Sequence, residues 1–327
     1  MKTVKAVSPF IHSGHLNFKF SPYDAWKKNS GQIAKGHYPW RAFQWAAFRY
    51  ELPSIIISDK EARLRFLEPV SLSFDTFPDY ARYEIIPMVW DCWPCYFDKM
   101  CAWLKKHQVK TAIFTSSQTA ERMRRRFPHM NIMFCPEAVD ISSYTHGKRL
   151  KERSIDVLEF GRSSNLNVNL RSATQGDASL AKNLNYNPSR SFRYVCTKVN
   201  GKFVFTNEQL YEAMGDARIT ITLPRSCTEP ELAGDIETLT QRYWECMLSR
   251  MVMLGHAPQE LIDLIGYNPV IEIDKEHVKE QILDILAHIE DYQALVNKNR
   301  ETALRIGSWD IRMKQVMDWL KGTGYEV

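Results

Sequence analysis

Long apolar runs are missing from this chain, and so is any sign of a disulfide framework. No apolar stretch approaches the ~20 residues that a helix needs to cross a bilayer. The first residues, Met1 to Pro9, contain no apolar signal core. The seven cysteines are an odd number spread along the sequence, which is typical of reduced thiols. These absences predict a cytoplasmic protein.

A strong excess of one charge is also lacking. The 43 Lys and Arg residues exceed the 38 Asp and Glu residues by five, which is too small an excess to favour nucleic acid as a partner. The apolar fraction of 44% is that of a globular protein, and 327 residues are more than one typical core can fill. We therefore expect two domains and no nucleic-acid partner.

From residue 84 onward, short apolar segments alternate with amphipathic ones. This alternation predicts an α/β fold with parallel strands covered by helices on both faces. Residues 163–190 have no periodicity and predict a long loop. The expected strands are 85–90, 111–114, 131–135, 154–160, 192–197, 251–255 and 268–274, and the expected helices are 39–50, 96–107, 117–127, 238–248, 258–265, 275–306 and 310–320.

The stretch from Asp235 to Glu245 is the most informative part of the sequence. Thr238 and Gln241 form a capping-box pattern that predicts a helix beginning at Thr238. Glu237 would then lie just outside the helix N-terminus, and Glu245 about two turns inside. A helix N-terminus can bind a phosphate, and carboxylates accept hydrogen bonds from sugar hydroxyls. Two carboxylates around such a terminus suit a nucleotide-sugar.

The Glu-x7-Glu spacing of this stretch, the strand that runs into Gly161-Arg162 and the run Ser308-Trp-Asp-Ile-Arg312 together resemble retaining glycosyltransferases of the GT-B fold, of the bacterial capsular polysaccharide and lipopolysaccharide type. The resemblance implies two Rossmann-like domains facing a cleft. They would be an acceptor-side domain at 1–145 and a nucleotide-sugar donor domain at 146–306. A C-terminal helix at 307–327 would cross back to pack on the first domain.

The same resemblance implies roles for individual residues. In the family, the first Glu of the motif contacts the donor sugar and the second contacts the nucleotide ribose. Glu237 therefore becomes a catalytic candidate, together with Asp91 at a strand end of the first domain, although the His that precedes this Asp in related enzymes is Trp90 here. The candidate donor-binding residues are Gly161, Arg162, Lys198, Thr238, Leu239, Thr240, Arg242 and Glu245.

Neither a metal nor another cofactor is expected. The chain has no Asp-x-Asp, the pair with which metal-dependent glycosyltransferases hold a divalent ion on the donor diphosphate. Arg162, a lysine and helix amides would instead neutralise the leaving group. The basic run Arg122-Met-Arg-Arg-Arg126 suits anionic lipid headgroups, so a lipid-linked or glycan acceptor and peripheral contact with the inner face of a membrane are expected.

Several alternatives remain open at this stage. A nucleotide-sugar 2-epimerase shares the GT-B fold, and an inactive donor-binding subunit would fit the missing His. The Cys92-x-x-Cys95 pair lies where a thioredoxin-like redox pair would lie, whereas Cys101 and His107 make only an irregular zinc set. The two glutamates could also be an ordinary helix cap and a surface carboxylate.

Overall fold

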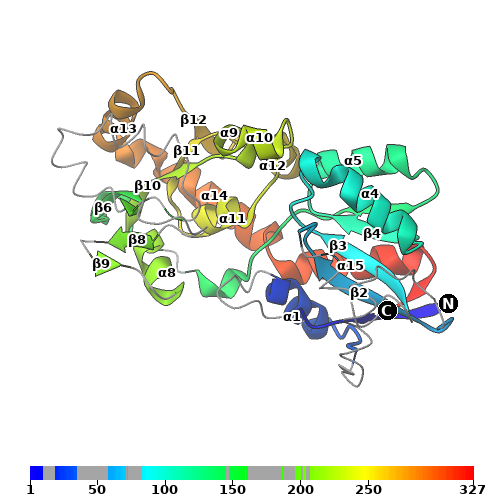
Figure 1. The fold of residues 1–327 in the computed structure, drawn as a ribbon. Helices are drawn as coiled ribbons and strands as arrows, with labels where there is room; N and C mark the ends of the chain where they lie inside the picture. The colour runs from blue at the N-terminus through cyan, green and yellow to red at the C-terminus, as the bar shows by residue number, and fades with distance from the viewer. Residues whose placement is uncertain are drawn as a thin grey trace. The chain divides into compact units, whose positions relative to one another are not determined.

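The chain folds into two compact units (Figure 1). The computed structural model describes residues 1–9, 19–34, 58–70, 72, 83–144, 147–158, 160, 186–187, 196–199, 202–203 and 207–327. Unit 1 comprises Met1–Ala138, Glu231–Thr238 and Trp309–Val327, and unit 2 comprises Val139–Pro230 and Leu239–Ser308. Within the described ranges, no helix is long and apolar enough to cross a membrane.

Unit 1 is built on a six-stranded sheet in the order β13-β1-β2-β3-β4-β5, and all neighbouring strands run parallel. Helices cover the sheet (Figure 1). The strands are β1 (Lys2–Ala6), β2 (Glu61–Leu67), β3 (Glu84–Val89), β4 (Thr111–Phe114), β5 (Asn131–Phe134) and β13 (Tyr325–Glu326). The helices are α1 (Phe20–Lys28), η2 (Pro94–Tyr96), α4 (Phe97–Lys106), α5 (Ser117–Arg126), α10 (Pro230–Ala233) and α15 (Trp309–Gly322). The first residue of α10, Pro230, belongs to unit 2.

Successive side chains of β3 point into different cores of unit 1. Ile86 packs in a core with Trp26 of α1 and Met313 of α15. Its neighbour Ile85 packs in a second core with Met100 of α4 and Met123 of α5. Because side chains alternate across a strand, α1 and α15 cover one face and α4 and α5 the other. Burial of both faces explains why β3 contains an almost continuous apolar run.

The C-terminal segment belongs to unit 1. Helix α15 lies beside α1, where the Asn29 side-chain amide donates to the Asp310 carbonyl at 3.1 Å. Strand β13 then pairs with β1. The Tyr325 hydroxyl is hydrogen-bonded to Thr111, with 2.9 Å between the two oxygens, and to Glu84. These contacts fix the last residues at the edge of the six-stranded sheet.

Unit 2 contains a four-stranded parallel sheet in the order β12-β11-β10-β6. Three short antiparallel strands form a separate sheet. The strands are β6 (Ile155–Leu158), β7 (Tyr186–Asn187), β8 (Cys196–Val199), β9 (Lys202–Phe203), β10 (Ala217–Thr222), β11 (Val252–Gly255) and β12 (Val270–Glu272). The helices are η3 (Ile141–Ser143), η4 (Leu150–Glu152), α8 (Asn207–Gly215), α9 (Arg225–Thr228), α11 (Gln241–Leu248), α12 (Gln259–Ile265), α13 (Val278–Ala287), η5 (Ile289–Tyr292) and α14 (Gln293–Ile306).

The sheet of unit 2 is also covered on both faces. Ile219 of β10 packs in a core with Ile282 of α13. Thr222 of the same strand faces α11, where its hydroxyl oxygen lies 3.9 Å from the Cys246 sulfur. Helix α11 therefore lies against one face and α13 against the other, as in other parallel sheets.

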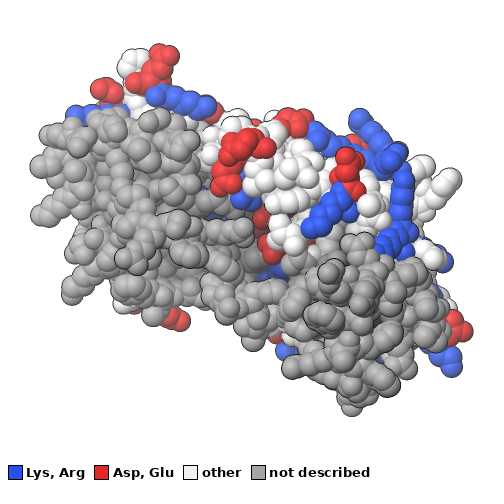
Figure 2. Space-filling model, viewed as in Figure 1, with Lys and Arg blue, Asp and Glu red and all other residues white. Residues whose placement is uncertain are grey.

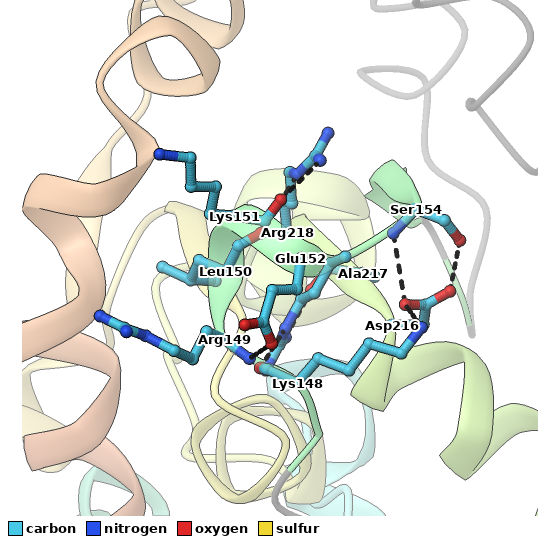
Figure 3. A network of polar contacts seen from close by, with 10 residues as sticks. Lys148, Arg149, Leu150, Lys151, Glu152, Ser154, Asp216, Ala217 and Arg218 are labelled. Carbon is cyan, nitrogen blue, oxygen red and sulfur yellow. Dashed lines mark hydrogen bonds and ion pairs between the residues drawn. The ribbon is translucent and has the colours of Figure 1, made fainter.

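A polar network fixes the chain just before β6 (Figure 3). Asp216 accepts a hydrogen bond from the Lys148 ammonium at 2.9 Å and another from the Ser154 backbone N–H at 3.2 Å. Arg153 is buried and donates to the Ala217 carbonyl at 2.6 Å. Burial lowers the pKa of Arg153 to about 10, so it stays charged at neutral pH. These bonds hold the start of β6 against the start of β10.

The α/β fold predicted from the sequence is confirmed. Strands 111–114 and 131–135 and helices 96–107, 117–127 and 258–265 are found with bounds that differ by at most one residue at an end. The predicted helix 275–306 is instead divided into α13, η5 and α14. The predicted strand 192–197 appears as β8, shifted to Cys196–Val199. The predicted helix 39–50 and most of the predicted loop 163–190 lie outside the described residues.

The helix predicted to begin at Thr238 begins at Gln241, and Thr240 takes the N-cap position without a side-chain capping bond. The predicted capping box is therefore wrong. Thr238 is buried in unit 1, and the buried Leu239 donates its backbone N–H to Glu260. These anchors hold the residues before Gln241 in an extended path, so Glu245 lies about one turn inside the helix.

Candidate functional site

Helix α11 starts at the carboxyl edge of the unit 2 sheet. It leads directly into β11, and the sulfur of its Cys246 lies 3.9 Å from the hydroxyl oxygen of Thr222, the last residue of β10. The Tyr243 hydroxyl donates to the carbonyl of His256, directly after β11, at 2.6 Å. In open parallel sheets, ligands bind outside the carboxyl ends of the strands. The start of α11 is therefore at the edge where a ligand is expected.

Gly255 allows β10 and β11 to approach closely at this edge. A Cβ atom at residue 255 would lie 1.8 Å from the Thr222 carbonyl oxygen, well inside van der Waals contact. Any side chain here would push the two strand ends apart. The geometry of the carboxyl edge therefore depends on glycine at this position.

Glu245 is half-buried in α11, with its carboxylate bound to a tyrosine. The Tyr144 hydroxyl donates to Oε1 of Glu245 at 2.8 Å, and the ring of Tyr211 packs edge-on against that of Tyr144 at 4.6 Å between centroids. Burial raises the pKa of the Glu245 carboxyl, while the Tyr144 bond and the charge of Arg242 lower it. The Glu245 carboxylate is thus a partly buried hydrogen-bond acceptor next to the aromatic pair Tyr144 and Tyr211.

A positively charged side chain, Arg242, lies in the same helix as Glu245. The Arg242 guanidinium lies over the Phe160 ring at 5.4 Å from its centroid, which places it at the carboxyl end of β6. Arg242 also belongs to the first turn of α11, where the helix dipole is positive. An arginine and a helix N-terminus side by side form an arrangement that binds phosphate groups.

The structure places the other predicted donor residues as follows. Gly161 and Arg162 lie outside the described residues, directly after Phe160. Lys198 lies in β8. Leu239 has a buried side chain, and its N–H is taken by Glu260. Arg242 and Glu245 are therefore brought together in unit 2, with Thr240 at the helix start.

Unit 1 has a small pocket of its own at the carboxyl ends of β3 and β4. Asp91, Ser116, Thr119 and Thr238 line it with polar atoms, and Trp93 is among its apolar lining. The roughly 200 Å³ of empty space in it includes open solvent, so the enclosed part is far below the ~300–1,000 Å³ typical of whole-ligand pockets. The pocket can therefore hold only part of a ligand. Its complete lining is Val89, Asp91, Cys92, Trp93, Phe114, Thr115, Ser116, Thr119, Ile236 and Thr238.

Two features of this pocket are unusual. Asp91 has a φ of 52°, in the left-handed region that few residues other than glycine adopt. The Thr238 hydroxyl is buried and makes no hydrogen bond within the described ranges. Such a group costs about 1–3 kcal/mol when it stays unsatisfied. Strained backbone and unsatisfied hydroxyls are concentrated at binding sites.

The segment that carries Glu237 is bound to α5 of unit 1. The Gln118 side-chain amide donates to the Asp235 carbonyl at 3.0 Å, and its oxygen accepts from the Glu237 N–H at 2.7 Å. Arg122 donates to both carboxylate oxygens of Asp235 at 2.7 Å. Ile236, between them, is fully buried. Glu237 and Thr238 are thus held in the same unit as Asp91, whereas Glu245 belongs to unit 2.

The cysteines of the Cys-x-x-Cys pattern do not resemble a redox pair. Both are free; Cys92 is buried and Cys95 exposed. Burial raises the pKa of the Cys92 thiol well above its usual range, whereas a redox-active thiolate needs a lowered pKa. No group of His, Cys, Asp and Glu side chains in the described ranges could hold a metal ion. Neither the redox nor the zinc alternative is therefore supported.

Sequence reasoning missed the residues that hold the site residues in place. Tyr144 lies 101 positions from Glu245, and Gln118 lies 119 positions from Glu237. No local pattern marks either contact. Ser116 differs, because a serine between a strand and a helix is a recognisable N-cap signal. Its side chain accepts a hydrogen bond from the Thr119 N–H.

The sequence matches no protein-family model and no curated protein, but solved structures share its fold. A sucrose-phosphate synthase from Thermosynechococcus elongatus has a TM-score of 0.56 at 14% identity, over 96% of this chain and 80% of that one. AviGT4, a glycosyltransferase involved in avilamycin A biosynthesis, has a TM-score of 0.55 at 10% identity, over 99% and 98%. TarM has a TM-score of 0.51 at 10% identity, over 84% and 57%. The chain therefore has the α/β fold of GT-B glycosyltransferases.

Proposed function

We propose that the protein is a retaining glycosyltransferase that moves a sugar from a nucleotide-diphosphate-sugar to a glycan or lipid-linked acceptor in surface polysaccharide synthesis. The observation that carries this proposal is the arrangement at the carboxyl edge of unit 2. There Glu245, Arg242 and the start of α11 lie together, in a chain with the GT-B fold.

In this proposal the donor nucleotide binds unit 2. Glu245 accepts hydrogen bonds from the ribose hydroxyls, because a carboxylate offers about four lone-pair sites and Tyr144 occupies one. Arg242 and the amides at the start of α11 face the diphosphate and stabilise the charge that develops on it as the sugar leaves. No metal ion is needed for these contacts, and the departing phosphate can accept the acceptor proton.

Unit 1 supplies the sugar-side contacts. Glu237 and Asp91 are proposed as the carboxylates that touch the reacting sugars. The pocket that Asp91 lines also includes Ser116 and Thr238, whose hydroxyls can either donate or accept. Such a mixture matches sugar hydroxyls, which are themselves both donors and acceptors.

A basic surface of unit 1 supports peripheral contact with an anionic membrane. Figure 2 shows lysine and arginine side chains over the region that α4 and α5 occupy in Figure 1. Two exposed acidic residues, Asp98 and Glu121, interrupt it. A basic residue near an anionic bilayer contributes about 1 kcal/mol. The exposed basic residues of α4, α5 and the turn between α4 and β4 are Lys99, Lys105, Lys110, Arg124, Arg125 and Arg126.

The experiment screens nucleotide-sugars for turnover by the wild type and by Glu237→Gln, with EDTA present. NMR then gives the anomeric configuration of the sugar product. Release of nucleoside diphosphate by the wild type, with retention of the anomeric configuration in the sugar product, is the expected result. Isomerisation of the sugar on its nucleotide would indicate an epimerase instead, and binding without turnover an inactive donor-binding subunit. Equal turnover in Glu237→Gln would contradict the assignment of Glu237.

A further inference from the structure

The carboxylate of Glu245 is held by a tyrosine from a segment that is itself anchored. Tyr144 directly follows η3, where Asp140 accepts from the Ser142 N–H at 3.0 Å and from its hydroxyl at 2.6 Å. At the start of the same segment, the Val139 N–H donates to the Gly307 carbonyl at 3.0 Å. Tyr144 itself is 8% exposed. Its hydroxyl therefore reaches Glu245 from a fixed position.

This contact leaves the carboxylate with unused capacity. Tyr144 donates one hydrogen bond to Oε1, and no other hydrogen bond to the Glu245 carboxylate is formed by the residues that the structure describes. Two adjacent ribose hydroxyls supply two donors. We infer that Tyr144 is a positioning residue that orients Glu245 as the acceptor for the ribose hydroxyl pair. The inference rests on the proposed function and adds a residue outside the Glu-x7-Glu motif to the nucleotide site.

The chemistry of the pair gives the inference a distinctive consequence. Only the ionised carboxylate accepts from both hydroxyls, and the Tyr144 bond favours that form by lowering the pKa of Glu245 against the effect of burial. Without the hydroxyl, the pKa of Glu245 rises, so a larger fraction is protonated at a given pH. The charged or titratable groups that face this cluster in the described residues are Arg242, Cys246, Tyr211 and Asp140.

The experiment titrates UDP, GDP, CDP and ADP into wild type and Tyr144→Phe by calorimetry between pH 5.5 and 9. For the nucleotide that binds the wild type, we expect Tyr144→Phe to weaken binding about tenfold near pH 6 and less than about twofold near pH 9. The acid limb of the affinity profile should therefore move to higher pH. The 2′,3′-dideoxy analogue lacks the hydroxyl pair but keeps the phosphates, which themselves titrate near pH 6, so its acid limb should be the same in the wild type and in Tyr144→Phe.

Tyr243→Phe is the matched control, because it removes a buried tyrosine hydroxyl of the same unit that bonds to the His256 carbonyl and not to Glu245. It should keep the wild-type pH profile. If Tyr144→Phe lost the same affinity at every pH, or lost none, the inference would be overturned while the proposed function would stand. A shift of the acid limb of the dideoxy analogue in Tyr144→Phe would also overturn it. If no ribonucleoside diphosphate binds the wild type, the proposed function fails as well.

Discussion

The carboxyl edges of the two parallel sheets carry different side chains. At the carboxyl edge of unit 2, Glu245 and Arg242 offer one anionic and one cationic group beside a helix N-terminus. At the carboxyl edge of unit 1, Asp91 lies in a small pocket with several hydroxyls. The first arrangement suits a nucleoside diphosphate and the second suits sugar hydroxyls. A shared sheet architecture thus leaves the side chains after each strand to decide what is bound.

The Glu-x7-Glu motif is divided between these two regions. Glu237 is held to α5 through Gln118, whereas Glu245 is held by Tyr144 in unit 2. The sequence spacing suggests one helix terminus with a carboxylate on either side. The structure instead places the two carboxylates in different units. Substitution of Glu237 and substitution of Glu245 should therefore affect different kinetic and binding constants.

The largest expected effect is the loss of turnover in Glu237→Gln. If Glu237 contacts the reacting sugar, removal of its charge should lower kcat by about 10²–10³-fold, the range found for a single electrostatic contact at a transition state. The Kd for the nucleoside diphosphate should stay within about twofold, because a Gln at this position leaves unit 2 unaltered. Calorimetry and initial rates measure the two quantities.

A parallel Glu245→Gln variant completes that comparison. It should weaken nucleoside diphosphate binding by about tenfold or more, because hydrogen bonds to a charged acceptor contribute ~1.5–3 kcal/mol. The same loss of nucleotide affinity in both variants would contradict the assignment of nucleotide binding to Glu245 and not to Glu237.

The next effect concerns the stability of the unit 2 edge. Gly255→Ala should lower the free energy of unfolding by about 3 kcal/mol, because overpacking against backbone cannot be relieved by a rotamer change. Hydrogen exchange should then rise in β10 and β11 more than in β3 and β4 of unit 1. Gly322→Ala is the control, since a Cβ there meets nothing within 4 Å. A similar stability of both variants would contradict the close approach of β10 and β11.

Much of the fold could be predicted because its helices and strands are encoded locally. Strands β4 and β5 are short, mostly apolar runs, and α5 begins at Ser117, directly after Ser116, a residue type that caps helices. By contrast, β1 was missed because its sequence, Lys-Thr-Val-Lys-Ala, contains two lysines and no continuous apolar run. Its strand state depends on pairing with β2 and β13, which lie far away in sequence.

The site was predicted only in part for the same reason. Glu245 and Arg242 share a helix with a recognisable pattern, so the sequence alone brought them together. The start of that helix was misplaced, because Leu239 is anchored by Glu260 and Thr238 is buried in unit 1. Such tertiary anchors override a capping pattern and leave no local trace.

A smaller effect is expected for the contact that holds Glu237. Gln118→Ala removes both hydrogen bonds to the segment 235–237, so Glu237 should be less well positioned. We expect kcat to fall about tenfold with nucleotide Kd unchanged, since small misplacements at a reacting centre are costly. Gln259→Ala is the control, because Gln259 pairs with Asp263 on an exposed surface of unit 2. Unaltered kcat in Gln118→Ala would show that this contact is only structural.

The last effect is a pH dependence that arises in unit 1. Burial and the charge of Lys106 lower the pKa of His107 to about 4 from an ordinary 6.5, so the folded state keeps it neutral while the unfolded state binds a proton below pH 6.5. Stability is therefore lost as the pH falls from 6.5 towards 4, by about 2 kcal/mol at pH 5. Urea unfolding of His107→Gln should show a shallower acid slope than the wild type. His129→Gln, at an exposed position, should keep the wild-type slope, and three equal slopes would contradict the assignment.

The most direct test of the donor site is calorimetry of UDP, GDP, CDP and dTDP with the wild type and Glu245→Ala, each in the presence of EDTA. We expect one nucleotide to bind the wild type despite the chelator, and its affinity to fall at least about tenfold in Glu245→Ala. Equal affinity of that nucleotide for both proteins, or no binding of any of the four to the wild type, would contradict a donor site at the carboxyl edge of unit 2.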